Sequence, residues 1–241
     1  MIAAVKTISC ACLLLCASVA AALAPDDPDA LYRRREDLQS AVRAADLWAG
    51  RAGRDYAAAW KLARVSYWLG THLPERMRRP ALERGVSAGE TAVQLGPAHP
   101  EGHFWLAADM GTLAESFGLV QGLKYRAKIR DELERVLTID PGWQGGSADA
   151  ALGQWYFEVP RLLGGSATKA EEHFRRALAY DPQNLVALSS FAELLVSRRR
   201  DVEARAMLQR LLDAPLSTEW APEDRVFKKQ AAATLSALRR P

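Results

Sequence analysis

Apolar residues recur at three- and four-residue intervals along most of the chain after residue 24. The spacing is clearest in three stretches, 55–69, 124–139 and 168–180, and it places apolar side chains on one face of an α-helix. No stretch of strand length alternates apolar with polar residues. The pattern therefore predicts an all-α protein.

The C-terminal half also carries a repeat of 34 residues. Four positions recur at this distance: Ala170, Phe174, Ala177 and Pro182 correspond to Ala204, Leu208, Leu211 and Leu216. Together with Gly153 and Tyr156 in the preceding segment, this period resembles the tetratricopeptide repeat (TPR), a pair of antiparallel helices. Small residues at such positions let paired helices approach, large ones fill the space between pairs, and proline ends the second helix.

Weaker copies of the repeat come earlier in the chain. Trp60 and Trp105 each lie in the first helix of a copy, so we expect four helix pairs. A leading helix over 30–50 and a capping helix over 223–239 would flank them. The expected fold is a TPR-like helical-hairpin solenoid, formed by one domain over residues 25–241.

Three copies are longer than the repeat requires. Seventeen residues separate Gly153 from Ala170, whereas 12 separate Ala192 from Ala204, so five extra residues are expected near 159–163. The same comparison places about eight extra residues near 117–124 and about nine near 71–81. All three insertions fall between the helices of a pair, at one edge of the solenoid. Such insertions often mark a binding face, although loop drift without function explains them equally well.

Residues 1–24 differ from the rest of the chain. Lys6 precedes an apolar run over 8–24 that ends in small residues, a pattern typical of a secretory signal peptide. The run is short for a membrane-spanning helix, and acidic residues rather than basic ones follow it. We therefore expect an exported, periplasmic protein. The alternative is a membrane anchor formed by an uncleaved or lipidated N-terminus.

The three cysteines, Cys10, Cys12 and Cys16, all lie in this segment. After cleavage the protein would have no disulfide, no thiol nucleophile and no cysteine ligand for zinc. Cys16 follows three leucines, whereas a lipid-modified cysteine requires a small residue just before it. This favours a free periplasmic protein over a lipoprotein.

The charge of the chain does not indicate a nucleic-acid-binding protein. The formal net charge is +3, and Lys6 would leave with the signal peptide, so no strong field for nucleic acid remains. The arginine runs at 33–35 and 198–200 are expected to be solvated helix ends or turns.

Few residues indicate chemistry. His99 and His103 are four residues apart, but Pro100 and Gly102 lie between them and no third ligand is evident, so we expect neither a metal site nor a cofactor. The glycine pairs at 145–146 and 164–165 follow no strand and lack the lysine of a phosphate-binding loop, and turns explain them better. No nucleophile motif is present. We therefore expect a protein that is not an enzyme.

Aromatic residues are the remaining binding candidates. Trp155, Tyr156 and Phe157 are adjacent, so their directions span about 200° around a helix. Most should pack in the core, but at least one is expected to face the groove. The candidate ligand or partner contacts are Trp105, Trp155, Tyr156, Pro160 and Arg161.

The segment 139–181 resembles the TatT family, the T component of TPR-associated TRAP transporters. Six residues match the family segment Pro-x-x-x-Gly-Gly-x-x-x-Lys-Ala-x-x-x-Phe: Pro160, Gly164, Gly165, Lys169, Ala170 and Phe174. The resemblance implies a periplasmic helical protein that docks the solute-binding protein of a TRAP transporter. It also implies a homotrimer and a channel or pocket for an apolar small ligand.

Two binding functions follow from these observations. The first is a binding or scaffold subunit of a TRAP-type transporter, and the alternative is a general TPR adaptor for cell-envelope protein assembly. Neighbouring transporter genes would favour the first, and binding of an extended peptide the second. An enzyme would require a metal or a coupled nucleophile and base, for example His99 and His103 converging with a carboxylate.

Overall fold

The computed structural model describes residues 27–238. Over this range the chain forms 11 α-helices and one short 3₁₀-helix, η1, so the prediction of an all-α fold is confirmed. None of these helices is long and apolar enough to cross a membrane. The signal peptide predicted for residues 1–24 lies outside the described residues.

Four helix pairs form the body of the molecule. Their bounds are α3 (Tyr56–His72) with α4 (Glu75–Leu95), α5 (Pro100–Ser116) with α6 (Leu119–Ile139), α7 (Trp143–Glu158) with α8 (Ala167–Tyr180), and α9 (Leu185–Ser197) with α10 (Asp201–Asp213). Before them come α1 (Pro28–Arg33) and α2 (Leu38–Ala52), and α11 (Ala221–Leu238) follows. Each helix packs on the next along the chain. The predicted four pairs and the capping helix are confirmed.

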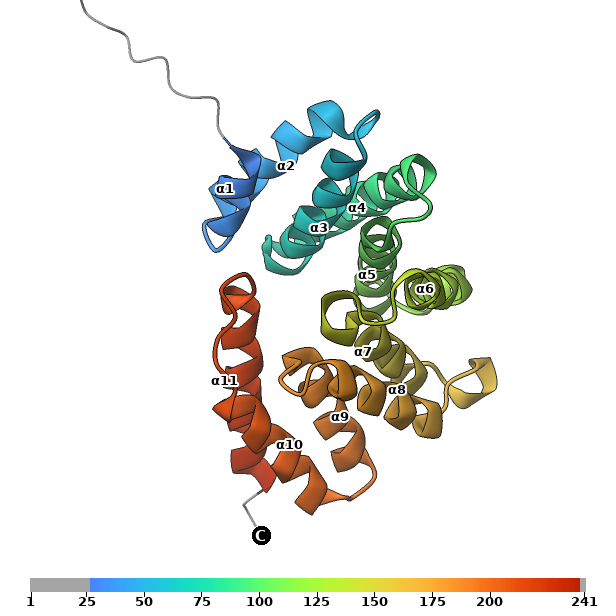
Figure 1. The fold of residues 1–241 in the computed structure, drawn as a ribbon, viewed down its shortest axis with the longest axis vertical. Helices are drawn as coiled ribbons and strands as arrows, with labels where there is room; N and C mark the ends of the chain where they lie inside the picture. The colour runs from blue at the N-terminus through green and yellow to red at the C-terminus, as the bar shows by residue number, and fades with distance from the viewer. Residues whose placement is uncertain (1–26, 239–241) are drawn as a thin grey trace, which may run out of the picture.

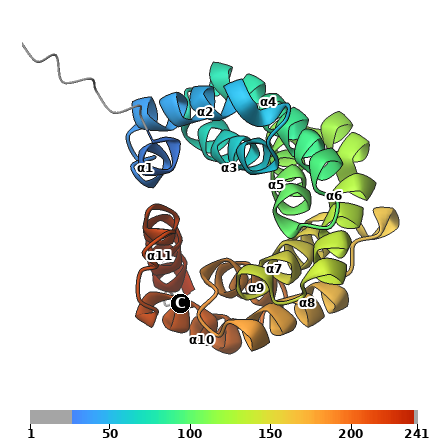
Figure 2. The ribbon, with the colours of Figure 1, turned by 45° about the horizontal axis from the view of Figure 1, so that its top comes forward.

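The pairs are arranged as an arch that nearly closes into a ring. Figure 2 shows α3, α5, α7 and α9 on the inner side and α4, α6, α8 and α10 on the outer side. The segment after α10 reaches the first helices, where Glu223 at the start of α11 accepts from Arg35, and α11 then runs back along α10 to Leu238 (Figure 1). The fold therefore offers one concave face, lined by the first helix of each pair.

The predicted single leading helix over 30–50 was wrong. Two helices, α1 and α2, occupy this stretch and are separated by residues 34–37. The reason is local: Asp27 and Asp37 each accept hydrogen bonds from backbone N–H groups in the following turn, and each thus starts its own helix. Arg35 lies in the break between the two helices, and its side chain reaches Glu223.

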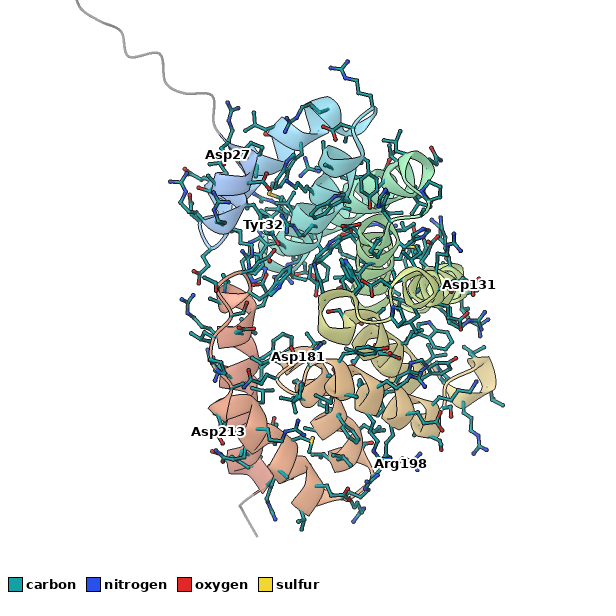
Figure 3. All side chains as sticks on the ribbon, in the orientation of Figure 1. Asp27, Tyr32, Asp131, Asp181, Arg198 and Asp213 are labelled. Carbon is teal, nitrogen blue, oxygen red and sulfur yellow. The ribbon has the colours of Figure 1, made fainter. Side chains whose placement is uncertain are left out.

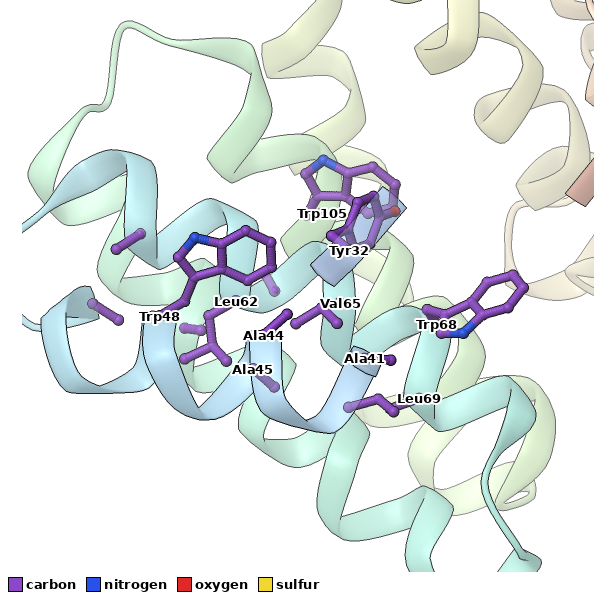
Figure 4. Close-up of a cluster of buried hydrophobic side chains, with 14 of the residues drawn as sticks. Tyr32, Ala41, Ala44, Ala45, Trp48, Leu62, Val65, Trp68, Leu69 and Trp105 are labelled. Atoms are coloured by element: carbon purple, nitrogen blue, oxygen red, sulfur yellow. The ribbon is translucent and has the colours of Figure 1, made fainter. Parts of the chain in front are cut away.

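Alanines make close packing possible in the first part of the core. Ala41, Ala44 and Ala45 on α2 are fully buried, and Figure 4 shows them facing the larger side chains of α3, including Leu62 and Leu69. Small residues on one helix let the backbone of its neighbour approach, so the larger side chains can fill the remaining space.

The three predicted insertions have different outcomes. The pair α3 and α4 is joined by residues 73–74 alone, and the pair α5 and α6 by residues 117–118. Their extra residues lengthen the helices, so α4 and α6 each have 21 residues while α10 has 13. Only the third insertion forms a longer turn, 159–166, which contains η1 (Arg161–Leu163). Two of the three expected loops were therefore wrong, because helix-favouring residues absorb the extra length.

Candidate partner-binding face

The inner helices contact one another around the arch. Helix α3 packs on α5, α7 on α9, and α9 on α11, and between α5 and α7 the rings of Phe104 and Trp143 meet at 4.8 Å. The side chains that pass between these helices on the inner side therefore define a continuous concave surface, which we call the inner face. Concave surfaces of this kind are where repeat proteins bind their partners.

Aromatic rings from three inner helices form one end of the inner face. Tyr67 on α3 lies 5.8 Å from Trp105 on α5, measured between ring centroids, and Phe104 contacts both Trp105 (5.2 Å) and Trp143 on α7 (4.8 Å). Trp220, just before α11, lies 6.1 Å from Trp105. Trp105 is only 4% exposed and is drawn in Figure 4. Its Nε1–H has no hydrogen-bond partner among residues 27–238.

Carboxylates form a second part of the inner face, at the C-terminal ends of the inner helices. Glu115 on α5 and Glu158 on α7 share a hydrogen bond. Partial removal from solvent raises the pKa of Glu115 to about 7, and the charge and hydrogen bond of Glu158 add to this shift. Burial and Glu158 also raise the pKa of Glu193 on α9. These carboxyls lie close enough to repel one another when ionised.

Two further titratable groups, Asp109 and Tyr67, lie on the inner helices themselves. Asp109 on α5 is fully buried, and neither of its carboxyl oxygens has a hydrogen-bond partner within the described chain. Burial raises the pKa of the Asp109 carboxyl well above its usual value. Burial, with added repulsion from Glu115, Glu223 and Asp109, raises the pKa of Tyr67 to about 12.

The C-terminal segment closes the arch through Arg35. The guanidinium donates to the Glu223 carboxylate (2.9 and 2.5 Å) and to the Glu219 carbonyl oxygen (2.7 Å). It also lies against the rings of Tyr32, Trp68 and Trp220, at 4.7, 5.2 and 5.7 Å.

The expectation that the run 33–35 is solvated was wrong for Arg35, which is 1% exposed. A second ion pair, between Arg64 and Glu219 (3.1 Å), supports the same closure. These contacts hold Trp220 in place over Trp105.

The predicted contacts Trp155 and Tyr156 lie in the core, at 7% and 8% exposure. Trp155 donates its Nε1–H to the carbonyl oxygen of Arg126 (3.0 Å), and Tyr156 stacks on His173. Trp105 is equally enclosed. Trp105, Trp155 and Tyr156 therefore pack in the core. Glu115, Glu158 and Glu193 are exposed, so a partner at the inner face can contact these carboxylates directly.

Pro160 and Arg161 are exposed, but they lie in the turn between α7 and α8 rather than on the inner face. Gly164 and Gly165 of this turn occupy positions that disfavour a larger residue. A Cβ on Gly165 would lie 1.6 Å from the Val159 carbonyl oxygen, and Gly164 has φ +108°.

The residues that define the repeat lie at helix crossings. A Cβ on Gly153 would lie 2.5 Å from the Phe174 ring, which shows how closely α7 approaches α8. Four others are completely buried: Ala170, Phe174, Ala177 and Ala204. Pro182 lies in the exposed turn after α8, where its carbonyl oxygen accepts from Arg210 (2.9 Å).

The two paired histidines do not converge on a common site. His99 lies against the ring of Tyr56, at 5.0 Å. His103 uses both ring nitrogens elsewhere, with Nδ1 on Glu132 (2.5 Å) and Nε2 on the Pro97 carbonyl oxygen (3.1 Å). No group of His, Cys, Asp and Glu able to hold a metal occurs within residues 27–238.

Two open surface hollows lie away from the inner face. One of about 310 Å³ is lined by residues of α2. The other, of about 520 Å³, lies between α8 and the turn that joins α9 to α10. Neither hollow is lined by the aromatic residues of the inner face. We therefore assign neither of them to the apolar ligand that the resemblance implies.

Comparison with known families decides the identity of the chain. The model of the family described as TAtT, TRAP transporter T-component, matches residues 100–237. The chain belongs to the TRAP transporter T-component family. The match spans α5 to α11, and these helices supply both the inner carboxylates and the closing segment.

A second family model, regulator of microtubule dynamics protein 1-3, matches residues 24–163 and overlaps the first over 100–163. Among individual proteins, regulator of microtubule dynamics protein 3 from Xenopus laevis is 26% identical over 104 residues. That match covers 43% of this T-component and only 22% of the Xenopus protein.

Solved structures support the TPR fold. The thermophilic TPR protein TTC0263 of Thermus thermophilus superposes with a TM-score of 0.64 at 24% identity, covering 87% of this T-component and 97% of that chain. The crystal structure of MamA superposes with a TM-score of 0.50 at 16% identity, covering 86% and 99%. At these identities the likeness shows the fold alone.

The sequence analysis missed the inner carboxylates and Arg35. The sequence does contain a signal for the inner carboxylates, because Glu115 and Glu158 occupy the last turn of the first helix in successive pairs. Aligning those helix ends would have brought the two carboxyls together. No comparable signal exists for Arg35, because its partner Glu223 lies 188 residues away.

Proposed function

We propose that this T-component is an exported binding subunit whose inner face docks the solute-binding protein of a TRAP-type transporter. The family match over 100–237 carries the assignment to the transporter. The role at the inner face rests on the arrangement of side chains there. In this proposal the chain is periplasmic and performs no chemistry of its own.

The inner face has the composition of a docking surface. Protein interfaces combine an aromatic centre with a polar, solvent-accessible rim. Here Phe104, Tyr67 and Trp143 are partly exposed beside Trp105. Glu115 lies near Tyr67 of this group, and Glu158 and Glu193 continue from Glu115 along the inner helices; none of the three forms an ion pair within residues 27–238. A basic patch on the partner would complement them.

A calorimetric titration tests the proposal. The chain as the cell exports it is titrated with the purified solute-binding protein of a TRAP transporter from the same organism. Saturable binding that weakens as salt is raised is the expected result, because screening reduces attraction between opposite charges. The absence of any heat of binding, together with binding of extended peptides, would favour the general envelope adaptor instead.

The homotrimer and the apolar ligand belong to the same proposal as consequences of family membership. Analytical ultracentrifugation of the purified chain measures the first. Mass spectrometry of small molecules released on denaturing the purified chain measures the second. A monomer that releases no apolar compound would remove both from the proposal and leave the docking role to be judged by calorimetry.

A further inference from the structure

Large apolar side chains project from one edge of the arch. This edge contains the turn inside each helix pair together with the first residues after it, and we call it the turn edge: residues 73–79, 117–126, 159–166 and 198–203. Five apolar residues on it are strongly exposed: Met77 (45%), Val120 (78%), Leu123 (50%), Leu162 (99%) and Val202 (78%). Exposed apolar side chains that cluster in this way mark an interaction surface.

Contacts join these turns into one strip. The Arg79 guanidinium lies 5.6 Å from the Phe117 ring, and Arg126 donates a hydrogen bond to the Leu163 carbonyl oxygen. Thr168 and Arg198 line the same surface hollow. Figure 1 shows the turn before α8 projecting from the body of the arch, and Figure 3 places Arg198 at the turn between α9 and α10.

The exposure of Leu162 is imposed by the turn that carries it. The Gly165 N–H donates to the Pro160 carbonyl oxygen (3.2 Å), and the Ser166 N–H donates to the Tyr156 carbonyl oxygen (2.8 Å). The backbone at Gly165 lies so close to Val159 that a Cβ there would be 1.6 Å from the Val159 carbonyl oxygen. Leu162 is thus held outward by a fixed turn.

The charges on the turn edge are mainly positive. Seven cations there form no ion pair within residues 27–238: Arg76, Arg78, Lys124, Arg126, Arg161, Arg198 and Arg199. Within the described residues, Glu75 and Asp201 are unpaired carboxylates of the edge, whereas Glu203 is paired with Arg200. Glu115 and Glu158, also without an ion pair in that range, directly precede two of the turns, so the unpaired cations still outnumber the unpaired carboxylates. The strip therefore combines projecting apolar tips with an excess of unpaired positive charge.

The opposite edge has a different character. Its turns carry Asp55, Asp140 and Asp181, whose side chains accept hydrogen bonds from nearby backbone N–H groups. Its large exposed apolar residues are Leu95 (43%), Tyr180 (50%), Val186 (42%) and Leu216 (46%), and none is as exposed as Val120, Leu162 or Val202. The contrast supplies a matched control within the same chain.

We propose that the turn edge binds the surface of an anionic lipid bilayer. Basic residues are attracted to anionic headgroups, and apolar tips such as Leu162 and Val120 enter the boundary between headgroups and acyl chains. A bilayer accepts projecting side chains without needing a matching hollow.

Hydrogen exchange of the full chain with vesicles tests this proposal. Three conditions are compared: no lipid, phosphatidylcholine vesicles, and vesicles containing about 30% phosphatidylglycerol, enough to give an anionic surface. Slower exchange at 117–126 and 159–166, only with the anionic vesicles, is the expected result. Unchanged exchange at these segments, or equal slowing at 96–99 and 181–184 on the opposite edge, would overturn the proposal.

Paired substitutions supply a second test that does not depend on the N-terminal segment. Leu162→Ser combined with Val120→Ser should lower the partition coefficient onto anionic vesicles about tenfold in a flotation assay, because both tips lose apolar contact. The control Leu95→Ser combined with Tyr180→Ser should change it less than about twofold. Equal effects of the two pairs, or no effect of either, would contradict binding through the turn edge.

Discussion

Glu115 is the individual residue with the clearest measurable consequence for stability. Its pKa in the folded protein is about 7, against 4.5 for the ordinary side chain, so the folded state binds the proton more tightly than the unfolded state. The stability from this group is fully present below pH 4.5 and is lost as the pH rises through 7. Solvent screening limits the size to about 1 kcal/mol.

Glu115→Gln should remove this pH dependence. Between about pH 5.5 and pH 8 the melting temperature of the wild type should fall by about 2–4 °C more than that of the variant. Thermal melts followed by circular dichroism at both pH values measure the difference. The control is Glu172→Gln, an exposed carboxylate on α8, which should behave like wild type. Parallel pH profiles for all three proteins would contradict the assigned carboxyl pair.

At the scale of elements, the turn between α7 and α8 depends on Gly165. Gly165→Ala would place Cβ 1.6 Å from the Val159 carbonyl oxygen, so the backbone must move. We expect a loss of about 2–4 kcal/mol in the free energy of unfolding, measured by urea denaturation.

The matched control for this substitution is Gly111→Ala in α5. No atom lies within 4 Å of a Cβ at that position, so the change should stabilise the helix by about 0.5–1 kcal/mol. A Gly165→Ala protein as stable as wild type would show that the turn does not hold its backbone in the described conformation.

Helix pairs could be predicted from the sequence because their cause is local and repeated. Small residues at crossing points, such as Gly153 and Ala170, recur with the repeat period and mark where helices meet. The length of turns was harder to predict, because extra residues near 71–81 and 117–124 could either loop out or extend a helix. Packing against the neighbouring helix pairs decides between the two outcomes. The sequence of a single repeat does not include those neighbours.

At the scale of the whole molecule, closure of the arch depends on Arg35. Arg35→Ala would leave Glu223, which is 21% exposed at its side chain, without its cation. Breaking such a pair should cost about 3 kcal/mol, and α11 should exchange its amide hydrogens faster. The exposed neighbour Arg34→Ala should cost less than about 0.5 kcal/mol. Differential scanning calorimetry compares the two variants, and equal melting temperatures would refute the closure.

The closure and the inner carboxylates share the reason why sequence analysis missed them. Arg35 appears in the sequence as part of a basic run, and the aromatic rings and carboxylate around it come from α1, α3 and the C-terminal segment. Burial in the assembled solenoid raises the pKa of Glu115, and Glu158, which α7 brings beside it, adds to the shift. Such properties arise from the curvature of the solenoid, which the repeat period alone does not determine.

We propose that the inner face binds the solute-binding protein of a TRAP-type transporter. The measurement that tests it most directly is the dissociation constant for that protein, compared by calorimetry between wild type, Glu158→Gln combined with Glu193→Gln, and the outer-face control Glu172→Gln. We expect the inner-face variant to bind about three- to tenfold more weakly at low salt and the control to bind like wild type. Equal affinities for all three proteins would contradict docking at the inner face.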